Sequence, residues 1–415
     1  MALPEKEFEE FKRSRFQYLW DNVAPLANEI ERTARFPREK FWKKFGELGL
    51  LGLTIPKEYG GTGLSESQFL EFEKECAKMH GSIRGVIHMH AGASEMFISG
   101  TEEQKRKYWP KLACGELDAA YAITEPDGGS GRDTKTTAIR KGSNFVLNGR
   151  KHFTTDADVA HIFNVVCRTQ ATSGEFQISN ILVEKGTKGF YVGEMAPTMG
   201  IKGQVHGRLT FVDCEVPITN IIGEEGKGVE AALNQLNVSR LRIAATALGV
   251  MQRCLDLSVE YAKQRVTFGK PIGERQAIQR YLAEMAQDIY ALQCAIEHAS
   301  KKADAGEDYF LEANLCKLIG VEGERRVTDN ALLVFGGMGY VREYPIEILY
   351  RDARINWIEE GTPTMQYLVS ARRLLEGKRT YERFHDEVIE NPVERHKRLA
   401  QQIIDRERDN RQGEK

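Results

Sequence analysis

Several features that mark other classes of protein are missing from this sequence. No apolar run approaches the ~20 residues that a membrane-spanning helix needs. The N-terminal segment MALPEKEFEEFKRSRF is charged from its fifth residue and lacks the apolar core of a signal peptide. The seven cysteines form no CxxC motif and no Cys/His pairing, which argues against structural zinc and a disulfide framework. These absences predict a soluble cytoplasmic protein with reduced thiols and no metal site.

The sequence also lacks an excess of either charge. Its 58 Lys and Arg against 60 Asp and Glu give a formal net charge of −2, so no global field favours nucleic acid or a membrane surface. The glycine-rich segments EPDGGSGRD, GEEGKG and FGGMGY match neither GxGxxG nor GxxxxGK[ST]. This argues against a nicotinamide cofactor in a Rossmann fold and against a P-loop nucleotide site.

Hydrophobic periodicity divides the chain into segments of different kinds. Residues 1–118 and 226–378 carry apolar residues at near-helical spacing, which predicts an N-terminal helical domain and a C-terminal four-helix bundle. Residues 119–225 contain short β-branched runs, which predict a β domain, and Asn148-Gly149 predicts a tight hairpin within it. Residues 379–415 form a charged C-terminal tail. Because helices and strands are segregated, we predict an α+β multi-domain fold whose central domain is a β-barrel or sandwich.

Five segments of this sequence resemble the acyl-CoA dehydrogenase family. They are YAITEPDGGSGRD (121–133), VPITNIIGEEGKG (216–228), QRVTFGKPIGERQAIQ (264–279), FGGMGYVREYPIEILYRDARI (335–355) and EEGT (359–362). One such motif is weak evidence, but five in the family's order and at its spacing are specific. The resemblance implies FAD between the β domain and the C-terminal bundle, and an acyl-CoA substrate. It also implies an electron-transferring flavoprotein as partner and a homotetramer.

The segment INWIEEGTPTMQ places two glutamates where a helical pattern ends. Carboxylates are disfavoured there, because the helix dipole repels negative charge at its C-terminal end. Desaturation of a thioester removes a hydride from Cβ and a proton from Cα, for which the protein supplies a base. By the resemblance Glu360 is that base, and Glu359 is a solvated or ion-paired neighbour. Some family members carry the base on the long helix instead, where this chain has Ser239, which cannot do that work.

The resemblance also implies a set of residues that bind the cofactor. They are Tyr121, Ile123, Thr124, Phe153, Thr155, Arg265, Thr267, Phe268, Gln276, Gly336, Gly337, Thr362 and Thr364. The part of the set around Arg265 matches residues that reach the FAD of a neighbouring subunit, where an arginine fork can bind pyrophosphate. Phe153 and Leu333 stand where the family more often has Trp and Gln.

Three residues are predicted to contact the substrate. The resemblance assigns Ser130, in the glycine turn, and Arg240, near the CoA moiety. Arg84 belongs to the segment that corresponds to the family's acyl pocket, residues 84–96, which is polar for an alkyl-binding wall. Its polar members are Arg84, His88, His90 and Glu95. Either these residues face outwards or form a buried polar pair, or the acyl group carries a carboxylate, hydroxyl or ring at its far end.

Other functions are open on the same scaffold. An acyl-CoA oxidase would differ from a dehydrogenase in consuming oxygen. A flavin monooxygenase needs no α-proton base, so the intact EEGT segment disfavours it. A non-enzymatic binding or assembly subunit would be expected to lose the glutamate or the TEP segment, and both are present.

Overall fold

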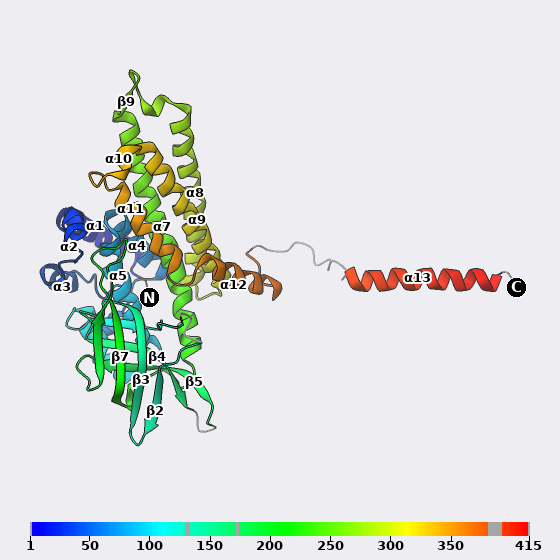
Figure 1. Ribbon diagram of the computed structural model, residues 1–415, viewed down its shortest axis with the longest axis horizontal. Coiled ribbons are helices and arrows are strands. Elements are labelled where there is room, and N and C mark those ends of the chain that lie inside the picture. The colour runs from blue at the N-terminus through cyan, green and yellow to red at the C-terminus, as the bar shows by residue number, and fades with distance from the viewer. Residues whose placement is uncertain (1, 129–132, 171–173, 381–391, 414–415) are drawn as a thin grey trace. The chain divides into compact units, whose positions relative to one another are not determined.

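The computed structural model describes residues 2–128, 133–170, 174–380 and 392–413 (Figure 1). The chain divides into two compact units, Met1–Glu376 and Gly377–Lys415. The second unit contains the predicted charged tail, which forms helix α13 (Pro392–Gly413). Within these described ranges, no helix is long and apolar enough to cross a membrane. The fold and the site discussed below belong to the first unit.

The first unit begins with helices that pack around an apolar core. The helices are α1 (Glu5–Asn22), α2 (Ala27–Thr33), α3 (Arg38–Glu47), α4 (Glu66–Met79), α5 (Gly81–Ser94) and α6 (Glu102–Ala113), with 3₁₀ turns η1 (Ala24–Leu26), η2 (Lys57–Tyr59) and η3 (Glu95–Ser99). Capping boxes begin α4, where Ser65 pairs with Gln68, and α6, where Thr101 pairs with Gln104. Each box satisfies two N–H groups that the helix itself leaves unpaired.

A single sheet follows the helices. Its strands are β1 (Ala119–Ala122), β2 (Thr137–Lys141), β3 (Asn144–Thr155), β4 (Ile162–Gln170), β5 (Phe176–Glu184), β6 (Phe190–Glu194), β7 (His206–Pro217) and β8 (Ile221–Ile222). Their order is β6-β7-β3-β2-β4-β5-β8, and β1 pairs with β4 in parallel. Helix α5 packs against β1, which brings the sheet next to the helical part of the site.

The hairpin predicted at Asn148-Gly149 is wrong. Both residues lie inside β3, and the turn that joins β2 to β3 falls at residues 142–143. A Cβ on Gly149 would lie only 2.5 Å from the Thr136 hydroxyl oxygen. Gly149 therefore allows β3 to pack closely against its neighbours at a bulge in its pairing with β7; it does not form a turn.

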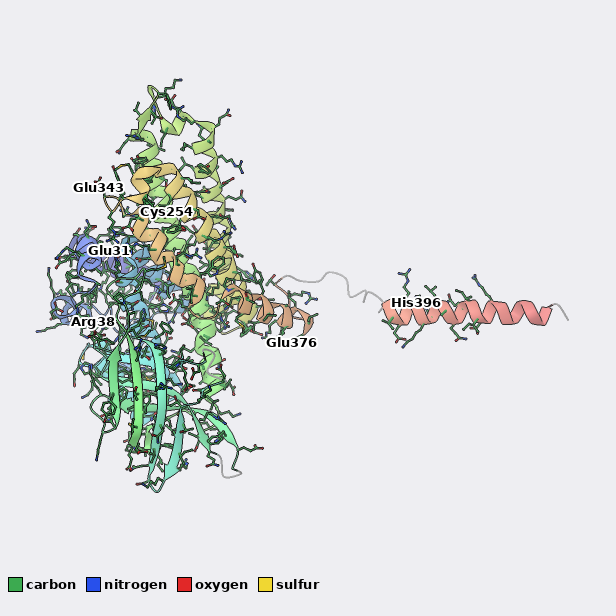
Figure 2. All side chains as sticks on the ribbon, viewed as in Figure 1. Glu31, Arg38, Cys254, Glu343, Glu376 and His396 are labelled. Carbon is green, nitrogen blue, oxygen red and sulfur yellow. The ribbon has the colours of Figure 1, made fainter. Side chains whose placement is uncertain are left out.

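Helices return after the sheet, with two short 3₁₀ turns, η4 (Ile218–Asn220) and η5 (Ile272–Glu274). They are α7 (Gly228–Gln264), α8 (Gln276–Asp304), α9 (Phe310–Phe335), α10 (Gly337–Tyr340), α11 (Ile346–Ile358) and α12 (Pro363–Leu375), with a hairpin of β9 (Val266–Thr267) and β10 (Lys270–Pro271) between α7 and α8. The core between the long helices includes Cys254 (Figures 1 and 2). The predicted succession of helical, β and helical parts is confirmed, and we propose domain boundaries at residues 118 and 225.

An ion-pair cluster joins the first helices to the sheet. Arg38, labelled in Figure 2, pairs with Asp118 at the start of β1 and with Asp156 after β3, the latter at 2.6 Å. Asp118 also contacts His90 Nδ1 at 2.9 Å, and His90 Nε2 lies 3.0 Å from the Leu112 carbonyl oxygen. Both nitrogens of His90 are thus used inside the protein.

A buried carboxyl group of α9 makes the stability of the fold depend on pH. Burial raises the pKa of Glu324 to about 8, although Asn356 donates a hydrogen bond to it at 2.9 Å. The folded state therefore binds this proton more tightly than the unfolded chain, whose glutamate has an ordinary pKa near 4.5. It follows that stability from this group is full below about pH 4.5 and is lost as the pH rises towards 8.

Glu324→Gln is expected to stabilise the protein at pH 8 by about 1 kcal/mol or more, because glutamine resembles the protonated acid and has no proton to lose. At pH 5 the two proteins should be nearly equal. Urea unfolding at both pH values measures the difference, with the partly exposed Glu322→Gln on the same helix as control. A variant that is less stable than the wild type at pH 8 would contradict this account.

Candidate active site

The end of α11 holds a glutamate in an unusual backbone conformation. Glu360 has φ 55°, in the left-handed region that side chains other than glycine seldom adopt, and Gly361 follows with φ 92°. The fully buried Lys317 of α9 donates hydrogen bonds to the carbonyl oxygens of Glu359 and Gly361, the second at 2.6 Å. Gln366 Nε2 of α12 donates to the Glu360 carbonyl oxygen at 3.0 Å. These bonds hold the turn against its strain.

Lys317 also explains how two negative charges are accommodated at the C-terminal end of α11. Burial lowers the pKa of Lys317 to about 8, with Glu360 and Glu359 acting in the opposite direction, so the group is still largely an ammonium at neutral pH. A cation at a helix C-terminus interacts favourably with the helix dipole. The two glutamates are therefore tolerated there because a buried cation sits among the last carbonyl groups.

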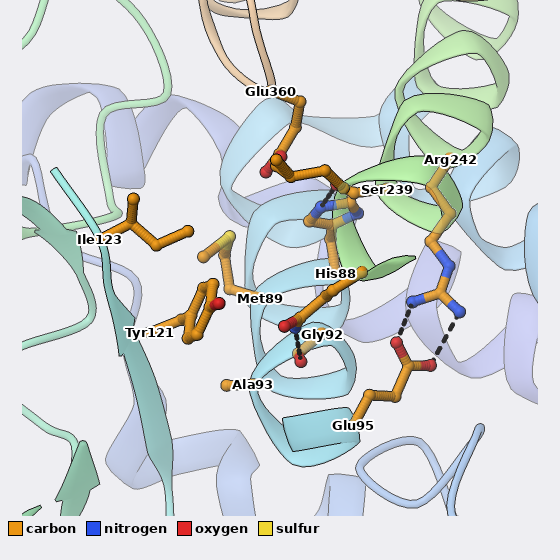
Figure 3. A pocket seen from close by; sticks show the side chains of 12 residues that line it. His88, Met89, Gly92, Ala93, Glu95, Tyr121, Ile123, Ser239, Arg242 and Glu360 are labelled. Carbon is orange, nitrogen blue, oxygen red and sulfur yellow. Dashed lines mark hydrogen bonds and ion pairs between the residues drawn. The ribbon is translucent and has the colours of Figure 1, made fainter. Parts of the chain in front are cut away.

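A cavity of about 70 Å³ lies beside Glu360 (Figure 3). Its walls come from α5, β1 and α7, which are far apart in the sequence. They include Met89, Ala93, Tyr121, Ile123, Leu236 and Ser239. The structure thus brings the predicted base together with two predicted cofactor residues and with the serine of the long helix.

The environment of Glu360 makes its carboxylate more basic than usual. Burial raises the pKa of Glu360 above its ordinary value, and the neighbouring Glu359 raises it further. His88, Lys317 and Arg240 partly offset this effect. A carboxylate with a raised pKa beside a cavity is suited to accept a proton from a bound molecule.

Two other buried polar groups near the cavity have no hydrogen-bond partner among the described residues. The Tyr121 hydroxyl is buried and has no hydrogen-bond partner within the described ranges, and burial raises the pKa of Tyr121 so that it stays neutral. Arg240 is buried, with Nε donating to the Glu360 carbonyl oxygen at 3.4 Å, while its Nη1 has no partner among the described residues. A buried guanidinium nitrogen of this kind fits a site for a polar or anionic ligand.

The structure gives no support to the predicted contact between Arg84 and a substrate. Arg84 is 2% exposed and does not line the cavity. Its Nε donates to Thr246 Oγ1 at 2.8 Å and to Glu73 Oε2 at 3.2 Å, and its Nη2 lies 3.4 Å from Glu359 Oε1. Glu73 is fully buried and also contacts His88 Nδ1 at 3.0 Å. Of the alternatives left open by the sequence, Arg84 therefore belongs to a buried polar pair.

Several predicted cofactor residues lie on accessible parts of the same region. Phe153 near the end of β3 is 59% exposed, and Thr155 lies 3.1 Å from His206 Nδ1. Thr124 is half-buried, directly after β1, while Thr362 and Thr364 are exposed beside Glu360. Gly336 and Gly337 lie instead at the other end of α9 from Lys317, beside the stacked rings of Phe335 and Tyr261, and both are exposed with open space where a side chain would stand. Ser130 falls outside the described residues.

The remaining predicted cofactor residues lie elsewhere. Arg265, Thr267, Phe268 and Gln276 occupy the β9–β10 hairpin and the start of α8, at the end of the bundle that points away from the sheet (Figure 1). Phe268 is 97% exposed, and Arg265 and Gln276 are exposed as well. Arg275 Nη2 supports the hairpin by donating to the Thr267 carbonyl oxygen at 2.5 Å. Within one chain, this group therefore cannot complete the site at Glu360.

Comparisons with known proteins agree with the architecture. Models of the acyl-CoA dehydrogenase N-terminal, middle and C-terminal domains match residues 5–116, 120–214 and 226–375. The sequence is 39% identical over 374 residues to the acryloyl-CoA reductase (NADH) of Anaerotignum propionicum, covering 89% of this chain and 95% of that protein.

Solved structures give the same result. Butyryl-CoA dehydrogenase from Megasphaera elsdenii superimposes with a TM-score of 0.85 and 31% identity, over 90% of this chain and 99% of that one. An acyl-CoA dehydrogenase from Bacillus anthracis complexed with FAD has a TM-score of 0.82 and 31% identity, over 90% of this chain and 68% of that one. The chain described here therefore belongs to the acyl-CoA dehydrogenase family of oxidoreductases.

Proposed function

We propose that the protein is a FAD-dependent acyl-CoA dehydrogenase, which converts an acyl-CoA thioester to the 2-enoyl-CoA. The observation that carries this proposal is the Glu360 carboxylate, which has a raised pKa and lines a cavity between α5, β1 and α7. Glu360 accepts the proton from Cα of the thioester. When bound, FAD supplies the acceptor for the hydride that leaves Cβ.

The residues around the cavity fit a flavin. Tyr121 of β1 and Ile123 just after it line the cavity beside Glu360, Thr124 follows them in the chain, and the unpartnered Tyr121 hydroxyl offers a donor. The exposed ring of Phe153 gives an aromatic surface for a flat ligand. Thr155, Thr362 and Thr364 are further candidates for holding FAD, and we retain Gly336 and Gly337, at the far end of α9, as candidates for the FAD of a neighbouring subunit. The orphan nitrogen of Arg240 supports a contact with the CoA moiety, and we retain Ser130 as a candidate there.

The exposed hairpin supports an oligomer in which subunits share cofactor sites. Phe268 is almost fully exposed at a hairpin that carries Arg265 and Thr267, an unusual position for a large apolar side chain on an isolated chain. We propose that this hairpin and Gln276 contact the FAD of a neighbouring subunit in a homotetramer.

Arg265→Ala is expected to weaken FAD retention about tenfold or more and to shift the tetramer towards smaller species, because one charge-assisted contact would be lost at each shared site. Flavin absorbance after gel filtration, with the elution volume, measures both effects. Arg280→Ala, which removes another exposed arginine of the same region, is the control. An Arg265→Ala protein that keeps full flavin as a monomer would overturn the shared-site proposal.

The direction of the reaction and the electron acceptor need separate tests. We propose an electron-transferring flavoprotein as acceptor, on the basis of the family. A second candidate is the reverse reaction, because the relative from Anaerotignum propionicum is named a reductase. In that case protonated Glu360 delivers the proton to Cα.

The proposed function is tested by adding saturated and 2-unsaturated acyl-CoA thioesters to the FAD-loaded protein without oxygen. Loss of the flavin absorbance band with a saturated thioester supports the dehydrogenase. No change with any saturated thioester, together with an absorbance change caused only by unsaturated ones in the presence of a reductant, favours the reductase. Rapid oxygen consumption in air indicates an oxidase.

A further inference from the structure

Three polar groups at the cavity wall have hydrogen-bonding capacity left. They belong to His88 of α5, Ser239 of α7 and Tyr121 of β1 (Figure 3). His88 Nε2 lies 3.5 Å from Ser239 Oγ, beyond the usual 2.7–3.2 Å of an N–H···O bond. The buried Tyr121 hydroxyl has no partner within the described ranges. A ligand atom between these groups would therefore find both donors and acceptors.

A hydrogen bond to Glu73, which does not line the cavity, fixes the orientation of the His88 ring. Its Nδ1 contacts Glu73 Oε1 at 3.0 Å, and Glu73 is fully buried. A carboxylate can only accept, so Nδ1 carries a hydrogen, and Nε2 is the nitrogen left to contact a ligand in the cavity. The hydroxyl group of Ser239 can donate and accept. This combination is complementary to a hydroxyl group, which both donates and accepts.

The arginine that lines the cavity within the described ranges is already paired with carboxylates. Arg242, which lines it, is 3% exposed and is already paired with Glu66 and Glu95. Its guanidinium makes contacts of 2.9 and 2.7 Å to Glu66 and of 3.0 and 2.8 Å to Glu95. The carboxylates of Glu95 and Glu360 also line the cavity. A carboxylate on the acyl group would lie near these two carboxylates, while the Arg242 guanidinium is already engaged.

The same ion pair limits the length of the acyl group. The cavity of about 70 Å³ is bounded by Arg242 and Glu95. Its apolar wall consists of small and medium side chains, Met89, Ala93 and Leu236. A long alkyl chain would have to separate a buried, hydrogen-bonded ion pair, which is strongly unfavourable.

We propose that His88 and Ser239 determine specificity, and that the substrate is a short acyl-CoA thioester with an uncharged hydroxyl substituent beyond Cβ. The hydroxyl forms hydrogen bonds with His88 Nε2 and with Ser239 Oγ, because it can both donate and accept. This inference rests on the proposed function, since it assigns the cavity to the acyl group.

The test compares 4-hydroxybutyryl-CoA with pentanoyl-CoA, which differ by a terminal hydroxyl in place of a methyl group. The FAD-loaded protein should show kcat/KM about tenfold or more higher for the hydroxy compound, as expected for an added hydrogen bond inside a buried pocket. Ser239→Ala should reduce this preference at least threefold, and His88→Leu should abolish it. Ser258→Ala, a buried serine of the same helix outside the cavity, is the matched control and should keep the preference.

Calorimetry with the unreactive 4-hydroxybutyl and pentyl thioethers of CoA separates this inference from the proposed function. If neither thioester bleaches the flavin but the hydroxy thioether binds more tightly in a Ser239-dependent way, the proposed reaction fails and the pocket assignment stands. Equal binding of the two thioethers, tighter binding of the pentyl compound, or an unchanged preference in Ser239→Ala would overturn the inference. A general loss of activity in His88→Leu alone does not imitate the expected result, because the measured quantity is a ratio.

Discussion

Glu360→Gln is expected to lower the rate of flavin reduction by at least ~10²–10⁴-fold, the loss typical of removing a general base. Glutamine is nearly isosteric and can still form hydrogen bonds, but it cannot accept the Cα proton as a carboxylate does. The loss should appear in kcat much more than in KM, because the proton transfer operates in the transition state. The backbone bonds from Lys317 and Gln366 do not involve the side chain, so the turn should persist.

Binding measurements distinguish this catalytic effect from a damaged site. The variant should retain wild-type FAD content, and calorimetry should show acyl-CoA affinity within a few-fold of the wild type. A Glu360→Gln protein that has lost its FAD or its affinity for acyl-CoA would point to a structural role for this glutamate.

Arg84→Ala is expected to destabilise the protein by about 3 kcal/mol, because it removes the guanidinium partner of the fully buried Glu73 and leaves His88 and Thr246 as its contacts. Any remaining activity should fall to the same extent for straight-chain and dicarboxylic thioesters, since the guanidinium does not line the cavity. Urea unfolding measures the first effect, and the ratio of kcat/KM values measures the second. The exposed Arg13→Ala should stay within about 0.5 kcal/mol of the wild type.

A double variant checks the stated cause. Glu73→Gln in the Arg84→Ala background removes the stranded charge and should recover part of the lost stability. A stable Arg84→Ala protein with a selective defect for dicarboxylic thioesters would return Arg84 to the substrate site.

The arrangement of the fold could be predicted because its signals are local. Helical periodicity before residue 118 and after residue 225, and β-branched runs between them, need no knowledge of tertiary contacts. The hairpin at Asn148-Gly149 failed for the opposite reason. Gly149 is needed because Thr136, just before β2, packs closely against it, and a turn rule applied to the dipeptide alone does not take this contact into account.

The candidate site was predicted less completely, since its support comes from pairs that are distant in sequence. Arg84 finds Glu73 and Thr246 only when α4, α5 and α7 pack together. Sequence reasoning missed Lys317, which holds the turn at Glu360. Its signal was a lone lysine in the apolar segment ANLCKLIG, where a charged side chain on a buried helix face requires a partner. The sequence does not predict the positive φ of Glu360.

The most direct test of the central claim compares Glu360→Gln with Glu359→Gln by anaerobic stopped-flow absorbance, using the best acyl-CoA substrate. Glu359 pairs with Arg84 and does not line the cavity, so its variant should bleach the flavin at a rate close to the wild type, while Glu360→Gln should bleach at least about a hundredfold more slowly. Rapid bleaching by Glu360→Gln, whether or not Glu359→Gln is impaired, would contradict the assignment of the base.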